Sequence, residues 1–162
     1  MRKAIKILVI SLFLLILVAC SRSEYTYKDN DGNVTISEYT GSDMYVVVPN
    51  MYQSKVVDTI DYNTYAYNIN IYHVRLSENT KLIRDCAFWC CTSLNTIYIP
   101  KGLEKIEEAA FYRCDNLKYV YFEDSENNII LEILDSNDWF KNAKAFYNVS
   151  VDEYESIIGS KE

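Results

Sequence analysis

Apolar residues recur along the middle of the chain with a period of 23 residues. Five identities fall in this register: Ile83 with Ile106, Ala87 with Ala110, Phe88 with Phe111, Cys91 with Cys114, and Leu94 with Leu117. The same step relates Val74, Ile97 and Val120, then Leu76, Ile99 and Phe122, and runs back to Ile60, Tyr65 and Ile71. Such a period predicts a repeat protein, in which equivalent side chains stack inward between neighbouring coils.

Each repeat is predicted to open with a short strand and to continue through turns. Residues 97–99 alternate branched and aromatic side chains, a pattern that favours strands. Pro100 should end this strand, because proline offers no N–H to a neighbouring strand. Residues 107–114 are predicted to form a short helical piece that directs Phe111 inward. One repeat cannot bury its own apolar face, so at least three are needed, and the chain has about three.

The two ends of the repeat array predict caps, which an exposed solenoid end requires. The alternating stretches YTYK and VTISEY flank the turn residues 29–33, so the front is predicted to be a β-hairpin. At the back, Trp139 and Phe140 are expected to cover the last layer of an irregular final repeat. The sequence SVDE is a capping box that starts a helix at 150–158, and Gly159 ends it.

The repeats resemble the leucine-rich repeats of BspA-like bacterial proteins. The stretches CAFWCCTSLNTIYIPKGLEKI and AAFYRCDNLKYVYF match the pattern AFxxCxxLxxIxIPxxVxxI of that family. The stretch VTISEYTGSDMYVVVP is similar to the opening segment of such domains, and residues 50–57 make the next interval about five residues longer than the later ones. The resemblance covers roughly residues 33–123. It implies an α/β, mainly β fold, a short solenoid of about three 23-residue rungs with a hairpin cap and a C-terminal helical cap.

The N-terminus predicts export. Three cations, Arg2, Lys3 and Lys6, precede an uninterrupted, mostly aliphatic run at 7–19, which is the layout of a secretory signal and is too short to span a bilayer comfortably. The run ends in LVAC, which resembles the lipobox of bacterial lipoproteins and implies cleavage before Cys20 and diacylation of its thiol. A plain signal peptide or a short anchor is the alternative. Two acyl chains would hold the protein stably at a membrane.

The predicted organisation is a lipoprotein signal peptide at 1–19, an acylated cysteine and short tether at 20–24, and a repeat domain at 25–162, divided into a hairpin cap at 25–48, repeats at 49–123 and a C-terminal cap at 124–162. Cleavage removes three of the 16 Lys and Arg, leaving 13 against 23 Asp and Glu, a formal charge of −10. Nucleic acid is therefore a poor partner, because phosphate backbones require compensating cations. Anionic lipid headgroups would also repel this surface, leaving the lipid anchor as the membrane contact.

Three of the five cysteines stand within six positions of the stretch DCAFWCCTSL. The repeat places Asn68, Cys91 and Cys114 in one Asn/Cys column, where a small, weakly polar side chain faces the turn backbone. Cys91 and Cys114 are therefore predicted to be architectural. Cys86 and Cys90 have no cysteine equivalent in the next repeat, so the repeat leaves them unexplained.

The sequence predicts no catalytic residue, metal site or cofactor. Zinc ligands need CxxC-like spacing with partners elsewhere, and His73, the single histidine, stands 13 positions from the nearest cysteine. A cysteine nucleophile would therefore lack a base. The acidic turn at 29–33 lacks the glycine and glutamate of a calcium loop. A disulfide between Cys91 and Cys114 stays open, because coils about 4.8 Å apart lie within bridging range.

Strand alternation predicts a binding face on the sheet. Side chains next to the inward ones must face outward. They form two neighbouring columns on adjacent repeats: Arg75, Tyr98 and Tyr121, and His73, Thr96 and Tyr119. Tyrosine and arginine are enriched at binding hot spots, so these residues are predicted to form an exposed platform for a ligand. Aromatic pairs that only stabilise neighbouring strands are the alternative.

The resemblance implies adhesion, because BspA-like proteins include adhesins for host matrix proteins and for other bacteria. The prediction is a membrane-anchored lipoprotein that faces the exterior of a bacterial cell and binds protein or glycan. The alternative is an accessory or structural component of an envelope complex without adhesive activity. It is favoured by the small size and by the tether at 21–24, which reaches only about 13 Å. The identity of the ligand and the oligomeric state stay open.

Overall fold

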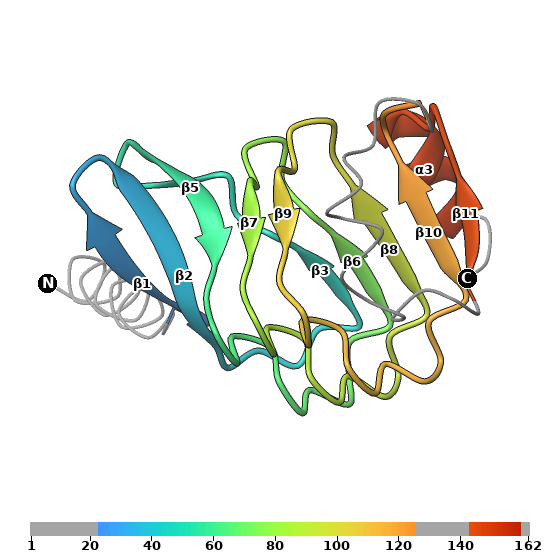
Figure 1. Ribbon diagram of the computed structural model, residues 1–162, viewed down its shortest axis with the longest axis horizontal. Helices are drawn as coiled ribbons and strands as arrows, with labels where there is room; N and C mark the ends of the chain where they lie inside the picture. Colours follow the sequence, from blue (N-terminus) through green and yellow to red (C-terminus); the bar gives the residue numbers. More distant parts are fainter. Residues whose placement is uncertain (1–22, 126–142, 160–162) are drawn as a thin grey trace, which may run out of the picture.

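The computed structural model describes residues 23–125 and 143–159, where the chain winds into a β-solenoid with two sheets (Figure 1). The first sheet contains, in spatial order, β1 (Tyr25–Asn30), β2 (Asn33–Tyr39), β5 (Lys55–Ile60), β7 (Leu82–Ile83) and β9 (Lys105–Ile106), and β4 (Met51–Tyr52) pairs with β5. The second sheet contains β3 (Tyr45–Val47), β6 (His73–Arg75), β8 (Thr96–Ile99), β10 (Tyr119–Phe122) and β11 (Lys144–Phe146). The described helix is α3 (Val151–Gly159). The mainly β solenoid fold is confirmed.

The 23-residue period of the sequence is the pairing register of the second sheet. Parallel strands align His73 with Thr96 and Thr96 with Tyr119. The step from β3 to β6 is longer, because Tyr45 aligns with His73 and the additional residues form the β4–β5 hairpin. The predicted opening segment supplies β2 and β3, which form a first coil ahead of the three repeats. Four coils therefore contribute one strand to each sheet.

An aromatic stack runs through the core along the solenoid axis. The ring of Phe88 lies 4.7 Å from the ring of Tyr65 and 4.9 Å from that of Phe111, with interplanar angles of 4° and 5°. All three side chains are buried. The inward direction of the predicted columns is thereby confirmed, and the spacing of the rings is the spacing of neighbouring coils.

The third side of each coil consists of successive turns, so the prediction of a helical piece at 107–114 is wrong. The N–H of Cys114 donates to Phe111 O three residues back, at 3.1 Å. Arg113 has a φ of 60°, and the equivalent residues of the two preceding coils share this left-handed conformation. A right-handed helix cannot continue through such a residue. Other turn N–H groups donate to the next coil instead, as that of Phe88 does at 2.7 Å.

The predicted N-terminal hairpin is confirmed. Strands β1 and β2 pair antiparallel. The turn between them has positive φ at Asp31 (49°) and Gly32 (128°), and positive φ at both central residues is characteristic of tight hairpin turns. Tyr25 and Tyr27 pack against the first layer of the core. The hairpin therefore covers the front end of the solenoid.

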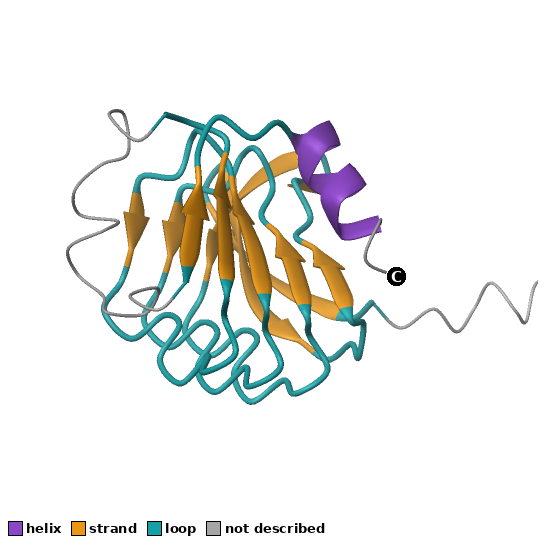
Figure 2. Cartoon of the chain, turned by 90° about the vertical axis from the view of Figure 1, so that its right-hand side faces the viewer, coloured by secondary structure: helices purple, strands orange, loops and turns teal. Residues whose placement is uncertain are grey.

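At the C-terminus the predicted helix start is confirmed, but the helix lies in an unexpected place. The N–H of Glu153 donates to Ser150 Oγ at 3.2 Å, as expected of an N-cap. Strand β11 pairs in parallel with β10, and α3 then packs on the outer face of the second sheet (Figure 2). The predicted cover by Trp139 and Phe140 lies outside the described residues. Within 23–125 and 143–159 no helix has the length and hydrophobicity needed to cross a membrane.

Candidate binding surfaces

The six residues predicted as a platform lie where strand alternation placed them, on the outer face of the second sheet. Parallel pairing aligns one column of Arg75, Tyr98 and Tyr121 and a second column of His73, Thr96 and Tyr119. The residues between the columns, such as Ile97, are buried on the core side. The predicted alternation is therefore confirmed.

Helix α3 covers this face, so the predicted exposure of the platform is wrong. Thr96 and Tyr98 are 0% exposed, and Tyr121 and His73 are also buried. The ring of Tyr154 in α3 lies 5.2 Å from that of Tyr98 and 5.3 Å from that of Tyr121. Tyr98 and Tyr121, which were predicted to contact a ligand, therefore pack against a helix of the chain itself.

Helix α3 packs on this face of the sheet because the helix is amphipathic. Tyr154 and Ile158 stand four residues apart, so they share one face of the helix, and both are buried. Asp152 and Glu153 lie exposed in the first turn, where acidic residues favour the helix dipole. Because the sheet presents aromatic rings on its outer face, the two apolar surfaces remove each other from water.

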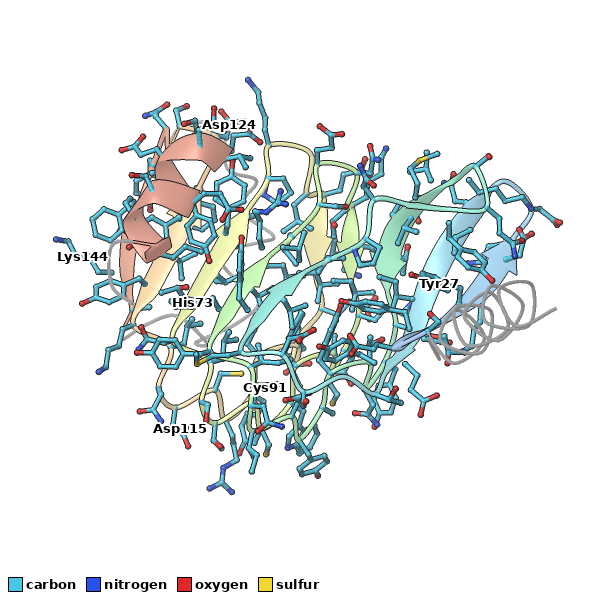
Figure 3. The ribbon with its side chains drawn as sticks, turned by 180° about the vertical axis from the view of Figure 1, so that it is seen from behind. Tyr27, His73, Cys91, Asp115, Asp124 and Lys144 are labelled. Carbon is cyan, nitrogen blue, oxygen red and sulfur yellow. The ribbon has the colours of Figure 1, made fainter. Side chains whose placement is uncertain are left out.

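The polar groups beneath α3 form a hydrogen-bonded network. The Thr96 hydroxyl lies 3.1 Å from the Tyr154 hydroxyl and 2.5 Å from His73 Nδ1. The Tyr154 hydroxyl also donates to Val74 O at 3.3 Å. Burial raises the pKa of Tyr154, so its phenol stays protonated and keeps its donor. Figure 3 marks the position of His73, the first residue of β6.

A second contact joins α3 to strands β3 and β6. Tyr45 donates to Glu155 Oε1 at 2.5 Å. Arg75 Nε lies 2.8 Å from the same oxygen, an ion pair whose N–H lacks hydrogen-bond geometry among the described residues. Burial, and next the Glu155 carboxylate, raise the pKa of Tyr45 to about 12. Of the predicted platform, only Arg75 and Tyr119 therefore remain partly exposed.

The Asn/Cys column hydrogen-bonds one coil to the preceding one. Its three side chains donate to backbone carbonyls at 3.1 Å each: Asn68 Nδ2 to Gly41 O, Cys91 Sγ to Tyr65 O, and Cys114 Sγ to Phe88 O. Contact with Cys91, and next burial, hold the pKa of the Cys114 thiol far above its ordinary value. Both thiols are free in this structure. A disulfide would remove both thiol donors, and the two carbonyls would keep only the backbone N–H groups of Asn68 and Cys91.

Cys86 and Cys90 stand at turn positions with a left-handed backbone. These positions differ from that of the Asn/Cys column, so the two cysteines do not belong to it. The φ of Cys86 is 58°, close to the 59° of Asn63 one coil earlier, and Cys90 (57°) matches Tyr67 (61°) in the same way. Burial raises the pKa of the Cys86 thiol. In the part of the chain that the structure describes, His, Cys, Asp and Glu form no group of three or more arranged to hold a metal ion.

Exposed aromatic side chains gather instead on the turn edge, the third side of the coils, which Asp115 marks in Figure 3. Tyr67 and Tyr112 are 69% and 56% exposed, and Trp89 on the intervening coil is partly exposed. The N–H of Tyr67 donates to Trp89 O at 2.7 Å, and the ring of Trp89 lies 5.4 Å from that of Tyr112 at 70°. These three residues, here called the aromatic strip, cross three adjacent coils.

The sequence contained a signal for the aromatic strip that periodicity alone did not isolate. Trp89 and Tyr112 each directly follow a residue of the inward aromatic column, and in a tight turn the neighbour of an inward residue faces outward. Tyr67 stands one position later in its own repeat, so the 23-residue step pairs it with Cys90. The strip therefore forms no aligned aromatic column in the sequence.

Solved structures with the same fold are bacterial leucine-rich repeat proteins. A leucine-rich repeat protein of Treponema pallidum has a TM-score of 0.58 and 23% identity, over 61% of this chain and 50% of that one. A leucine-rich cell surface protein of Faecalibacterium prausnitzii has a TM-score of 0.54 and 23% identity, over 64% and 32% of the two chains. A leucine-rich repeat protein of Bacteroides capillosus has a TM-score of 0.61 and 20% identity, over 78% and 96%. This chain thus spans half the length of the first of these proteins and about a third of the second.

A search of curated proteins gives no significant match. A family model described as the BspA type leucine rich repeat region matches residues 34–159 in six copies. The matched range runs from the second residue of β2 to the end of helix α3, so it includes the four coils, the aromatic stack and the helix that covers the second sheet. The chain belongs to the BspA-type leucine-rich repeat family.

Proposed function

We infer that this protein is an exported, membrane-anchored binding module that recognises a macromolecular partner through the turn edge of its solenoid. The observation that carries this proposal is the exposure of Tyr67 and Tyr112 and the partial exposure of Trp89 on three adjacent coils, next to a sheet face that α3 covers. Exposed apolar patches mark interaction sites in soluble domains. Tyrosine and tryptophan are also the side chains that contribute most to binding hot spots.

Export and lipid anchoring are supported by the N-terminal sequence and by the family. The cationic start, the apolar run and the LVAC sequence favour lipidation at Cys20. A structural relative from Faecalibacterium prausnitzii is described as a cell surface protein. On this proposal the repeat domain faces the exterior of the cell, where an adhesin-like protein meets its partner.

A role in binding rather than catalysis is supported by the environment of the reactive side chains. His73, the one histidine of the chain, is buried and lies 2.5 Å from the Thr96 hydroxyl. Cys86 and Cys114 have raised pKa values, whereas a cysteine nucleophile needs a lowered one. These groups are thereby disfavoured as general base and nucleophile.

A second candidate function, an accessory component of an envelope complex, is favoured by the length of the tether. Strand β1 begins at Tyr25, five residues after Cys20. The residues between them reach about 13 Å at full extension. A domain held so close to a bilayer would meet a neighbouring membrane protein more readily than a distant surface.

The two candidates differ in accessibility, which labelling of intact cells measures. For the adhesin-like function we expect antibodies against the repeat domain to bind intact cells, and Cys20→Ala to release the domain into the medium. Attachment of the cells to their substratum should fall with Tyr67→Ala combined with Tyr112→Ala. If the domain becomes accessible only after the wall is stripped, and crosslinks to a membrane protein, the accessory role is correct and the adhesin-like function is rejected.

A further inference from the structure

We propose that the turn edge binds a linear, uncharged glycan, which runs across the coils along the stacking direction of the solenoid. This inference rests on the proposed function, since it names the partner of the same surface. It follows from three features of the turn edge: ring faces that are open to solvent, the polar groups beside them, and the balance of charge.

The ring faces suit the apolar side of a sugar. A pyranose carries C–H groups on its faces and hydroxyl groups around its rim, so it binds by laying a face on an aromatic ring. Tyr67 and Tyr112 are more than half exposed, and the rings of Trp89 and Tyr112 meet at 70° and form a corner. Tyr62, 54% exposed, opens the first of these turns and adds a further ring to the edge.

The polar groups beside the rings suit the hydroxyl rim. The exposed polar side chains of the same turns include amides and a hydroxyl, beside charged groups: Asn63, Asn70, Thr92 and Asn116, with Arg84, Glu108, Arg113, Asp115 and Lys118. Amides both donate and accept hydrogen bonds, as sugar hydroxyls do, and carboxylates accept them. Asn116 Nδ2 donates to Thr92 O on the preceding coil at 2.7 Å, which fixes its amide in place.

The spacing of the coils suits a linear polymer. The inner rings of successive coils lie 4.7 and 4.9 Å apart, and the residues of the turn edge repeat with the same step. This step is comparable with the length of one pyranose residue in an extended chain. Successive sugars could therefore meet successive coils, with Trp89 and Tyr112 at equivalent positions and Tyr67 one position later, and the three coils of the aromatic strip would hold a short oligosaccharide.

The charge of the turn edge favours an uncharged glycan over a polyanion. The three turn segments at 61–72, 84–95 and 107–118 contain five acidic residues and three basic ones, and the whole chain has a net charge of −7. Arg84 lies 3.7 Å from Asp61 and is thus partly neutralised. Because the net negative charge of the turn edge repels negatively charged polymers, sulfated or carboxylated glycans would be disfavoured.

Fluorescence of Trp89 tests the inference directly. The chain has two tryptophans, so the full-length protein with Trp139→Phe reports Trp89 alone. It would be titrated, in a nonionic detergent without sugar headgroups, with four soluble neutral polysaccharides: hydroxyethyl cellulose, laminarin, arabinoxylan and galactomannan. Heparin serves as the polyanion. We expect a saturable shift of the emission to shorter wavelength with at least one neutral polysaccharide and none with heparin.

Matched variants locate the site. Tyr67→Ala with Tyr112→Ala should weaken the response at least about tenfold, because two exposed rings of hot-spot type are lost. Tyr52→Ala is the control, since Tyr52 is an exposed tyrosine on β4, away from the turn edge. Retardation of the protein in native gels that contain each polysaccharide is the second measurement, and thermal unfolding verifies that each variant is folded.

Two outcomes would overturn the inference. One is no shift and no gel retardation with any of the four neutral polysaccharides, and the other is an equal response in the Tyr67 and Tyr112 double variant. If no polysaccharide binds, but cells with the Tyr67 and Tyr112 double variant lose their attachment, the partner is a protein. The proposed function then stands and the glycan is rejected. If attachment is also unchanged, both fail.

Discussion

The hydroxyl of Tyr154 in α3 lies 3.1 Å from the hydroxyl of Thr96 in the middle of the second sheet. A single side chain from the C-terminal helix thereby reaches the face on which strand alternation placed a ligand site. The aromatic rings of the sheet surround it on both sides, and Glu155 joins the same helix to Tyr45 and Arg75. The helix is therefore a structural part of the solenoid, and we propose the turn edge as the surface for recognition.

Substitution of Tyr154 measures how firmly α3 is held. Tyr154→Ala should lower the free energy of unfolding by about 3 to 5 kcal/mol, as for other large buried aromatic residues. Tyr154→Phe keeps the ring but removes the hydroxyl between Thr96 and Val74 O, so it should cost about 1 to 3 kcal/mol. Urea unfolding followed by circular dichroism gives both values.

Ser156 provides the control for these variants, because it is an exposed residue of the same helix. Ser156→Ala should change the stability by no more than about 0.5 kcal/mol. Equal stability of Tyr154→Ala and the unchanged protein would mean that α3 does not contribute to folding, and the covered sheet face would then be open to a ligand in solution.

Most of the solenoid could be predicted from the sequence because its architecture repeats. A residue such as Phe88 meets the same neighbours as Phe111, so one period fixes the strand register, the inward columns and the Asn/Cys column together. The hairpin and the start of α3 were predictable for a different reason: turn and capping residues act locally, through the φ of Gly32 and the hydroxyl of Ser150.

The covered platform and the aromatic strip could not be predicted in the same way, because both depend on contacts outside the period. Alternation decides that Tyr98 faces outward, but solvent reaches it only if no other element packs there, and α3 has no equivalent in the repeats. The prediction of a helical piece at 107–114 was wrong because of the backbone conformation of the turns. The stretch around Arg113 has a helical composition, but that residue adopts the left-handed φ at which the N–H groups of the equivalent Tyr67 and Cys90 donate to the next coil.

Phe111→Ala tests the stacked core. Its ring is buried and stacks on Phe88 at 4.9 Å, so the variant should lose about 3 to 5 kcal/mol. Domains of this size are stable by about 5 to 15 kcal/mol, so the protein should be partly or fully unfolded at 37 °C. Thermal unfolding by circular dichroism measures the effect. The neighbouring exposed residue gives the comparison, because Tyr112→Ala should have nearly the same unfolding temperature as the unchanged protein. Similar losses of stability in both variants would contradict the inward position of Phe111.

Cys91 tests whether the Asn/Cys column acts through its hydrogen bond. Cys91→Ala removes the thiol that donates to Tyr65 O, and that carbonyl keeps the N–H of Asn68, so the variant should lose about 0.5 to 1.5 kcal/mol. Cys91→Ser keeps a donor of similar size and should cost less than Cys91→Ala. Urea unfolding under non-reducing conditions compares the two. If both variants lose several kcal/mol and the unfolded protein lacks two reactive thiols, a disulfide with Cys114 is present instead.

The contact between Tyr45 and Glu155 predicts a loss of stability in alkali. Burial raises the pKa of Tyr45 from 10.0 to about 12 in the folded protein, with Glu155 as the next cause. The unfolded chain therefore releases this proton first, so the contribution of Tyr45 to stability is complete below pH 10 and is lost as the pH rises toward 12. The urea midpoint should be constant from about pH 7 to 9 and should fall above pH 10. Tyr45→Phe cannot ionise, and other groups titrate equally in both proteins, so the difference between the two midpoints isolates this residue. A fall of equal steepness in Tyr45→Phe would show that Tyr45 does not hold α3 against the sheet.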